Sequence, residues 1–172
     1  MHIKRFLLIF VFGFQLTNAA AQERGLNKNK IPASIANYLK QNYPTAKGKD
    51  YYQKSEHDTL YYEVEFKLKS QVYNLKFSSD GILTETEREI EMEDLAAELK
   101  QLISGVLHDN FQKMKIKKIL EVNPLGKKQY ELYIKVTQSK KYKPGFYNVM
   151  FDSKGGLVSI KEEELHSIES VF

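Results

Sequence analysis

Two stretches with the same alternation decide the fold of this chain: Tyr73-Asn74-Leu75-Lys76-Phe77 and Tyr147-Asn148-Val149-Met150-Phe151. In each, the first, third and fifth residues are apolar, which is the pattern of a strand with one buried face. Each stretch runs into a turn sequence, Ser78-Ser79-Asp80-Gly81 in the first case and Asp152-Ser153-Lys154-Gly155-Gly156 in the second. Such turns favour hairpins, and the matched pattern predicts that one supersecondary unit occurs twice.

A helix is predicted ahead of the strands in each copy. Pro32 suits the first turn of the first helix, and Tyr43-Pro44 ends it because the residue before a proline disfavours helix. Glu93 and Asp94 suit the first turn of the second helix, where acidic residues favour the helix dipole. Apolar residues recur at helical spacing in both segments: Ile31, Ile35, Tyr38, Leu39 and Tyr43 in the first, and Leu95, Leu99, Leu102, Ile103, Val106 and Leu107 in the second.

Strands with strict alternation precede the two deciding stretches. Their apolar residues are expected to point inward: Tyr62, Val64, Phe66 and Leu68 in the first copy, and Tyr130, Leu132, Ile134 and Val136 in the second. No Gly/Ser/Pro linker separates the copies, so a single merged structure is expected. The predicted fold class is α+β, with two tandem αβ4 units that form one curved antiparallel sheet and two helices packed on one face.

The N-terminal segment has the features of a secretory signal peptide. Lys4 and Arg5 are basic, the run from Phe6 to Phe14 is apolar but too short to span a bilayer, and Ala19-Ala20-Ala21 is a small-residue cleavage site. An uncleaved N-terminal anchor is the alternative. The predicted organisation is a signal peptide at 1–21, a flexible leader at 22–30, a first unit at 31–92 and a second unit at 93–172, which places the mature protein in the periplasm or outside the cell.

Composition excludes several classes of function. The chain has no cysteine, which excludes thiol chemistry, disulfides and a lipoprotein anchor. It has 26 basic and 22 acidic residues, and removal of Lys4 and Arg5 with the signal peptide leaves 24 basic residues and a net charge of +2. We therefore expect no nucleic-acid partner and, after cleavage, no membrane span. The expected partner is another extracytoplasmic protein, and the expected oligomeric state is a monomer or a weak dimer.

The order of motifs resembles a known family. An Ile31-Pro32 helix start, Tyr43-Pro44, the strand Tyr61-Tyr62-Glu63-Val64, the strand from Tyr73 to Phe77 and the Asp80-Gly81 turn are together similar to the PepSY-like, β-lactamase-inhibitor-like family of secreted bacterial proteins. The resemblance is best over residues 31–90 and weaker over 93–165. It implies tandem αβ4 units with helices on the convex side of a curved sheet.

What the same resemblance implies about function is limited. Related PepSY domains are associated with peptidase inhibition in propeptides, and the β-lactamase inhibitor grips an enzyme with its concave sheet. The inhibitory residues of neither family match positions in this chain, so none is carried over.

Aromatic residues and one loop are the candidate partner-binding residues. Tyr61 and Tyr133 lie on the outward phase of their strands, at places that the alternation pattern makes equivalent. They are either contacts on an open sheet face or cross-strand packing. The second copy alone has a long loop before its third strand, in which cations and aromatic residues mix. That loop is either an interaction site or a solubilising loop, and its candidate residues are Lys140, Lys141, Tyr142 and Phe146.

Acidic and histidine residues give little support to a metal or catalytic site. Glu85, Glu87, Glu89 and Glu91 share one face of a strand, and such a row either binds Ca²⁺ or a basic partner or is a solvated face. Calcium needs oxygens that converge on one point, which a linear row does not supply. His57, His108 and His166 stand singly, without a metal-binding or nucleophile motif.

The sequence thus predicts no catalytic, cofactor-binding or metal-binding residue. The predicted function is a non-enzymatic extracytoplasmic binding module that inhibits or chaperones another envelope or secreted protein through its open sheet face. The alternative is a small-ligand or Ca²⁺-binding protein that uses the concavity of the sheet.

Overall fold

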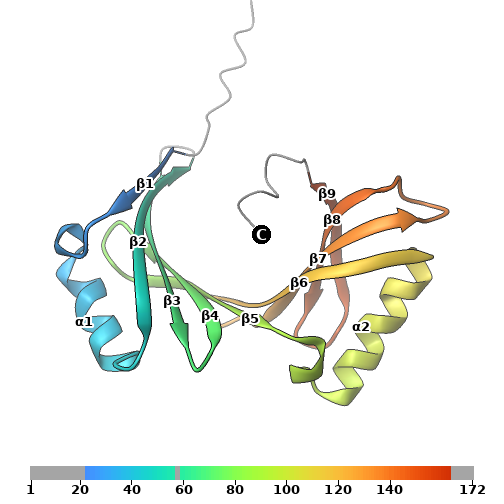
Figure 1. The fold of residues 1–172 in the computed structure, drawn as a ribbon, viewed down its shortest axis with the longest axis horizontal. Helices are drawn as coiled ribbons and strands as arrows, with labels where there is room; N and C mark the ends of the chain where they lie inside the picture. Colours follow the sequence, from blue (N-terminus) through green and yellow to red (C-terminus); the bar gives the residue numbers. More distant parts are fainter. Residues whose placement is uncertain (1–21, 57–58, 164–172) are drawn as a thin grey trace, which may run out of the picture.

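The computed structural model describes residues 22–56 and 59–163 and arranges them as one antiparallel sheet with two α-helices (Figure 1). Nine strands are found in these residues, and their order in the sheet is their order in the chain. The strands are β1 (Gln22–Leu26), β2 (Lys47–Glu56), β3 (Thr59–Leu68), β4 (Gln71–Ser78), β5 (Leu83–Ile90), β6 (Lys113–Pro124), β7 (Gln129–Gln138), β8 (Gly145–Asp152) and β9 (Leu157–Glu163). The helices are α1 (Ala33–Asn42) and α2 (Ala97–Asn110), and short 3-10 turns lie at Lys28–Lys30 and Met92–Asp94.

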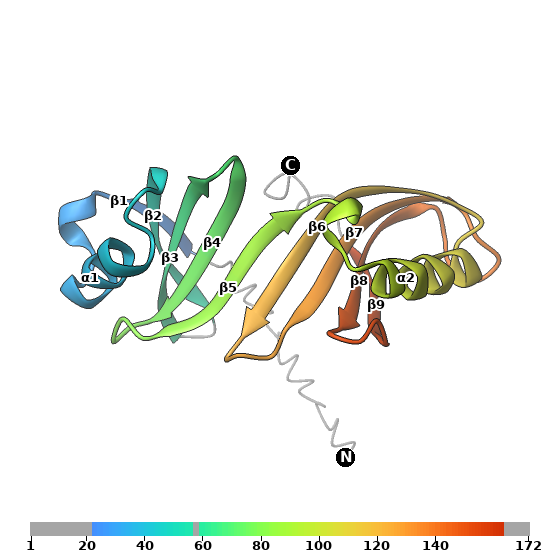
Figure 2. The same ribbon diagram turned by 90° about the horizontal axis from the view of Figure 1, so that it is seen from below.

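The sheet is strongly curved, and both helices lie on its convex side (Figure 1). Figure 2 looks at that side and shows α1 at one end of the sheet and α2 towards the other, with β5 between them. No helix covers the concave face in the described part of the chain. The predicted α+β class, the single curved antiparallel sheet and the placement of two helices on one face are therefore confirmed.

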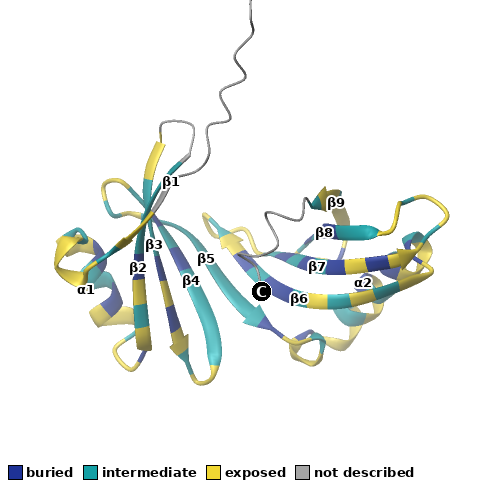
Figure 3. Ribbon diagram, turned by 45° about the horizontal axis from the view of Figure 1, so that its top comes forward, coloured by how far each residue is buried: buried dark blue, intermediate teal, exposed yellow. Residues whose placement is uncertain are grey.

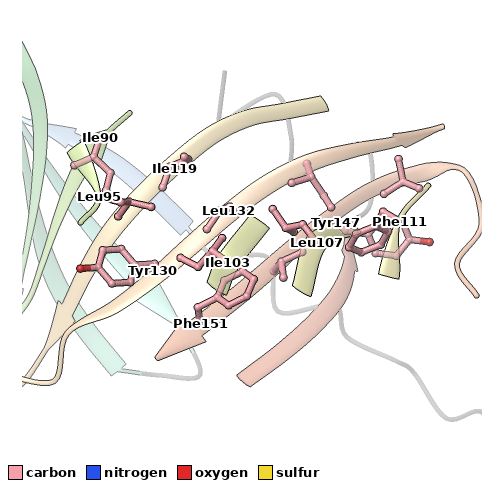
Figure 4. Packing of buried hydrophobic residues seen from close by; sticks show 13 residues of the cluster. Ile90, Leu95, Ile103, Leu107, Phe111, Ile119, Tyr130, Leu132, Tyr147 and Phe151 are labelled. Carbon is pink, nitrogen blue, oxygen red and sulfur yellow. The ribbon is translucent and has the colours of Figure 1, made fainter. Parts of the chain in front are cut away.

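Each helix covers its own apolar core. In the first core, Ile35 and Leu39 of α1 pack with Val64, Phe66, Leu75 and Phe77, all of which are buried. In the second core, Ile103 and Leu107 of α2 pack with strand residues that include Leu132, Val149 and Phe151 (Figure 4). The strand residues in both cores belong to the inward phase of the alternation. This pattern leaves the intervening residues of every strand on the concave face.

Strand β5 joins the two halves. Its first residue, Leu83, packs against the first core, and its last residue, Ile90, belongs to the second. Between the cores, on the convex side, Arg88 forms an ion pair of 3.3 Å with Glu121 of β6. Figure 3 shows that β4 and β5 are largely of intermediate burial where the two halves meet. The junction is therefore held by the backbone ladder and by polar contacts more than by a shared apolar core.

The predicted start of the second helix was wrong. Glu93 and Asp94 do not lie in the first turn of α2, which begins at Ala97. They belong to a separate 3-10 turn in which the Glu91 and Asp94 side chains each accept a hydrogen bond from the other residue's backbone N–H. This reciprocal capping gives the backbone N–H groups of Glu91 and Asp94 their acceptors within the turn. The chain is extended again at Leu95 before α2 starts.

The segment expected to be a flexible leader contains an edge strand. Residues of β1 pair with β2, and Leu26, opposite Tyr51, packs against the first core. The polar composition of this segment gave no sign of the pairing. The predicted signal peptide at 1–21 and the tail at 164–172 of the predicted second unit lie outside the described residues.

The β4–β5 turn carries a glycine whose replacement tests the docking of α1. Gly81 has a φ of +78°, and a Cβ atom there would collide with the Ser34 side chain on α1. Gly126 has a φ of +83°, but a Cβ atom there would meet no other atom within 4 Å. Both alanine variants should lose about 1 kcal/mol of unfolding free energy from backbone strain. Gly81→Ala should lose a further 1–3 kcal/mol, roughly, from the forced contact with the helix.

Urea unfolding of the two variants beside the parent protein measures this difference. Equal losses for Gly81→Ala and Gly126→Ala would contradict the close packing of α1 on this turn.

Candidate functional site

The concave face has a hollow of about 390 Å³ where the sheet bends. Six successive strands, β2 to β7, contribute to its lining because alternate residues of each strand point to this face. The lining residues are Tyr52, Lys54, Glu63, Glu65, Val72, Asn74, Glu87, Glu89, Lys118, Leu120 and Tyr133. The hollow therefore combines carboxylates, an amide and aromatic rings in a space the size of a ligand pocket.

Cross-strand pairing brings opposite charges together on the side of the hollow formed by the first half. Tyr52 lies opposite Glu63, and Glu63 lies opposite Lys76. The Lys54 Nζ atom is 2.7 Å from a Glu63 carboxylate oxygen. The Lys76 Nζ atom lies 4.2 Å from the centre of the Tyr61 ring, a cation–π geometry.

Glu87 occupies the centre of this arrangement, on the strand that joins the two halves. Asn74, opposite it on β4, donates a hydrogen bond of 3.4 Å from Nδ2 to the Glu87 carboxylate. Burial, and after it the nearby Glu85 charge, raises the pKa of Glu87 to about 7. Glu131 and Glu63 contribute in the same direction, so carboxylates from β3, β5 and β7 face one another across the bend.

Tyr133 belongs to a second polar group on the β7 side of the hollow. Its hydroxyl lies 3.5 Å from Glu131 Oε2, and Asn148 Nδ2 donates to the same carboxylate oxygen at 3.1 Å. Burial and the Glu131 charge raise the pKa of Tyr133 to about 12. Tyr133 is therefore a neutral hydrogen-bond donor at neutral pH, and its ring forms part of the wall of the hollow.

Tyr61 and Tyr133 do not occupy equivalent places, which corrects the prediction from the alternation. Tyr133 lies opposite Asn148, whereas the counterpart of Asn148 in the first half, Asn74, lies opposite Glu65. The alternation gave the correct face but not the register, because register depends on the turns between strands. The β3–β4 turn is residues 69–70, and the β7–β8 loop is residues 139–144.

Tyr61 lies outside the hollow. It lines a separate depression of about 360 Å³ with Lys76, Ser78 and Thr84. The two tyrosines therefore share the concave face, and the structure does not bring them into one site.

The basic loop is tied down at its base. Ser139 Oγ donates to the backbone oxygen of Asn110 at 2.8 Å and accepts from the backbone N–H groups of Lys141 and Tyr142. The Tyr142 ring packs against Phe111, with 5.1 Å between ring centres, and covers the second core. Tyr142 thus has a packing contact that accounts for it without a partner.

The other residues predicted in this region lie apart from the hollow. Lys140 and Lys141 are exposed in the loop, and Lys141 Nζ lies 5.2 Å from the centre of the Tyr142 ring. Phe146 lies on β8 opposite Lys135, whose Nζ atom is 5.6 Å from the centre of its ring. Neither these three residues nor Tyr142 lines the hollow.

Sequence reasoning overlooked Asn74 and assigned Glu87 only to an undifferentiated acidic row. Asn74 stands in one of the two stretches that decide the fold, on the phase opposite to the apolar residues. A polar residue at that phase beside a strand with alternating glutamates, Glu85, Glu87 and Glu89, was the available signal. The bend of the sheet brings Glu63 and Glu131 close enough to raise the pKa of Glu87. This arrangement depends on strands that are distant in the sequence, so no local motif indicates it.

Metal-ligand clusters and membrane-spanning helices are absent from the described ranges. No group of three or more His, Asp or Glu side chains between residues 22 and 163, outside 57–58, could hold a metal ion. Neither described helix combines the length and apolarity that membrane crossing requires.

Comparison with known proteins identifies relatives of the fold. No known protein family matches the sequence, and no curated protein does. A DUF2874 family protein from Bacteroides uniformis superposes with a TM-score of 0.62 at 14% identity, covering 77% of this chain and 89% of that one. A BLIP-like protein from Bacteroides fragilis gives 0.59 at 14% identity, with coverages of 76% and 85%. The chain therefore has the fold of BLIP-like and DUF2874 proteins.

A third similar structure comes from Bacteroides eggerthii, where the protein is thought to be periplasmic. Its TM-score is 0.59 at 18% identity, and the match covers 76% of this chain and 88% of that one. At 18% identity this similarity establishes the fold alone.

The ionisation of Glu87 should make stability depend on pH. A folded-state pKa of about 7, above the ordinary value of 4.5, means that the native state binds the proton more tightly than the unfolded state. The unfolding free energy should therefore fall as pH rises from about 4.5 to about 7. Glu87→Gln keeps an acceptor for Asn74 and cannot ionise. It should be more stable than the parent by about 1–3 kcal/mol at about pH 8, with little difference near pH 4.5.

Urea titrations at both pH values measure the difference, and Glu65→Gln, at an exposed carboxylate of the same hollow, is the matched control. A gain for Glu87→Gln that is the same at both pH values would contradict burial of an ionising group.

Proposed function

We propose that this chain is a non-enzymatic binding module that works outside the cytoplasm and holds another extracytoplasmic protein on the concave face of its sheet. The observation that carries the proposal is the difference between the two faces of the sheet. Both apolar cores are completed on the convex side by α1 and α2. The concave side presents charges and tyrosines around a hollow to which six strands contribute.

The composition of that face suits recognition of a protein. Tyrosine is enriched in protein interfaces because it combines a large ring with a polar end, and Tyr52 and Tyr133 both line the hollow. The exposed Lys140 and Lys141 lie in the β7–β8 loop, apart from the hollow, and would add complementarity to an acidic rim on the partner. Inhibition or chaperoning of the bound protein is the role that the resemblance to β-lactamase-inhibitor-like proteins favours.

The proposed location rests on two observations. Residues 1–21 have the composition of a signal peptide, and the Bacteroides eggerthii protein with the same fold is thought to be periplasmic. Both favour a protein that acts in the periplasm or after secretion.

The proposal includes an origin by duplication of one PepSY-like αβ4 unit. Four antiparallel strands follow each helix in the described chain, α1 before β2–β5 and α2 before β6–β9. The stretch around Asn74 forms the third strand after α1, and the stretch around Asn148 forms the third strand after α2. A duplicated unit accounts for two separate cores under one continuous sheet.

A small-ligand binder is the second candidate function, and the volume of the hollow favours it. A space of about 390 Å³ falls in the range of small-molecule pockets. A thermal-shift screen of soluble metabolites separates this candidate from the first, because a ligand that binds only the folded state raises the melting temperature.

Affinity capture from the cell envelope tests the protein-binding function. The mature protein should enrich a partner, and Tyr133→Ala should weaken that capture roughly tenfold or more, as truncation of a central interface aromatic does. Charge reversal at Lys140 and Lys141 should reduce capture less and more strongly at low salt. Leu102→Ala is the matched control, because Leu102 is exposed on α2 on the opposite side of the sheet.

Tyr142 is left unchanged in these variants because it packs on the second core. The proposal is contradicted if circular dichroism shows every variant folded and no captured protein depends on Tyr133.

A further inference from the structure

The hollow contains a carboxylate and an amide that are incompletely satisfied by the protein. Asn74 Nδ2 reaches the Glu87 carboxylate over 3.4 Å, which is long for a hydrogen bond. The Asn74 Oδ1 atom is buried and accepts no hydrogen bond from any described residue. A buried acceptor without a donor is unfavourable, so this pair would be stabilised by a hydrogen-bond donor supplied by a ligand.

The cations of the hollow have other interactions. Lys54 forms the 2.7 Å ion pair with Glu63, and Lys76 lies against the Tyr61 ring. Among the ion pairs of the described residues, none involves Glu87. Glu87 is therefore a carboxylate at the middle of the face whose protein partner is a neutral amide.

Neighbouring carboxylates make the place around Glu87 attractive to a cation. Glu85, Glu131 and Glu63 all act on Glu87 and raise its pKa, and Lys76 acts on Glu85 in the opposite direction. The other titratable groups that line the hollow are Tyr52, Glu65, Glu89, Lys118 and Tyr133. Carboxylates from three strands thus act on Glu87, and a ligand cation beside it would relieve that repulsion.

We propose that the hollow receives one arginine side chain of the protein partner, with its guanidinium between the Glu87 carboxylate and Asn74 Oδ1. Arginine fits this pair better than lysine because its planar group carries several donors in a fixed fork. One edge of the fork can donate to the carboxylate while a remaining N–H donates to the amide oxygen. The rings of Tyr52 and Tyr133 in the same lining suit the flat guanidinium and its aliphatic stem. The inference rests on the proposed protein-binding function and names the group that the partner inserts.

Arginine binding should be linked to the ionisation of Glu87. With a pKa of about 7, the carboxylate is about one-tenth ionised at pH 6 and about nine-tenths ionised at pH 8. Since the guanidinium pairs with the ionised form, apparent affinity should follow that fraction. Binding should therefore tighten roughly tenfold over this range and release a proton at the lower pH.

The test titrates N-acetyl-arginine N′-methylamide into the isotope-labelled mature protein and follows backbone NMR shifts at about pH 6 and about pH 8. We expect weak but saturable binding centred on β4 and β5, about tenfold tighter at the higher pH. N-acetyl-citrulline N′-methylamide, a neutral analogue of the same shape, should bind at least tenfold more weakly, and the corresponding lysine derivative should bind several-fold more weakly. Glu87→Gln should remove the pH dependence and weaken binding at least tenfold, whereas Glu98→Gln, at an exposed carboxylate on α2 on the opposite side of the sheet, should change it less than twofold.

Absence of saturable binding at pH 8, equal binding of the citrulline probe, or unchanged binding by a folded Glu87→Gln variant would each overturn the inference. Capture of a Tyr133-dependent partner together with no binding of the arginine probe would overturn this inference and leave the proposed function standing. Binding of the probe without any captured partner would support the arginine site and count against the protein-binding function.

Discussion

The packing of each helix onto its own half of one continuous sheet is the constraint on which the rest of the structure depends. Ile35 and Leu39 complete the first core, Ile103 and Leu107 complete the second, and all four are almost fully buried. Because both helices lie on the same side, every strand buries one phase of its residues and leaves the other phase on the opposite face. The polar concave face follows from that arrangement.

The junction between the cores determines where the site lies. At β5 the convex side has an ion pair in place of a shared apolar core, and the concave side has Glu87 and its neighbouring carboxylates. Curvature brings side chains of β3, β5 and β7 close enough to act on one another's pKa values. The central strand thus holds the two halves together and also carries Glu87, which forms no ion pair with another described residue.

Much of the fold could be predicted from alternation and turn chemistry. Alternation identified buried residues correctly, for example Val64 and Phe66 in β3 and Leu132 and Ile134 in β7. It could do so because a strand with one buried face carries an apolar residue at every second position. Contacts set by the turns were predicted less well. The reciprocal capping of Glu91 and Asp94 closes a separate 3-10 turn, so α2 begins only at Ala97. Tyr61 lies opposite Ser78 and Tyr133 opposite Asn148, a register that alternation alone does not give. The pairing of Asn74 with Glu87, and the effect of Glu131 on Glu87, depend on register and curvature that no local motif specifies.

A photo-crosslinking amino acid placed on each face of the sheet in living cells tests the central claim, that the concave face holds the partner. One version replaces Tyr133 in the hollow, and the other replaces Leu102, which is 54% exposed on α2. The account predicts a discrete crosslinked species from position 133 and none from position 102 when both proteins are produced at equal levels. A crosslink from position 102 alone would show that the convex side makes the contact and would contradict the account.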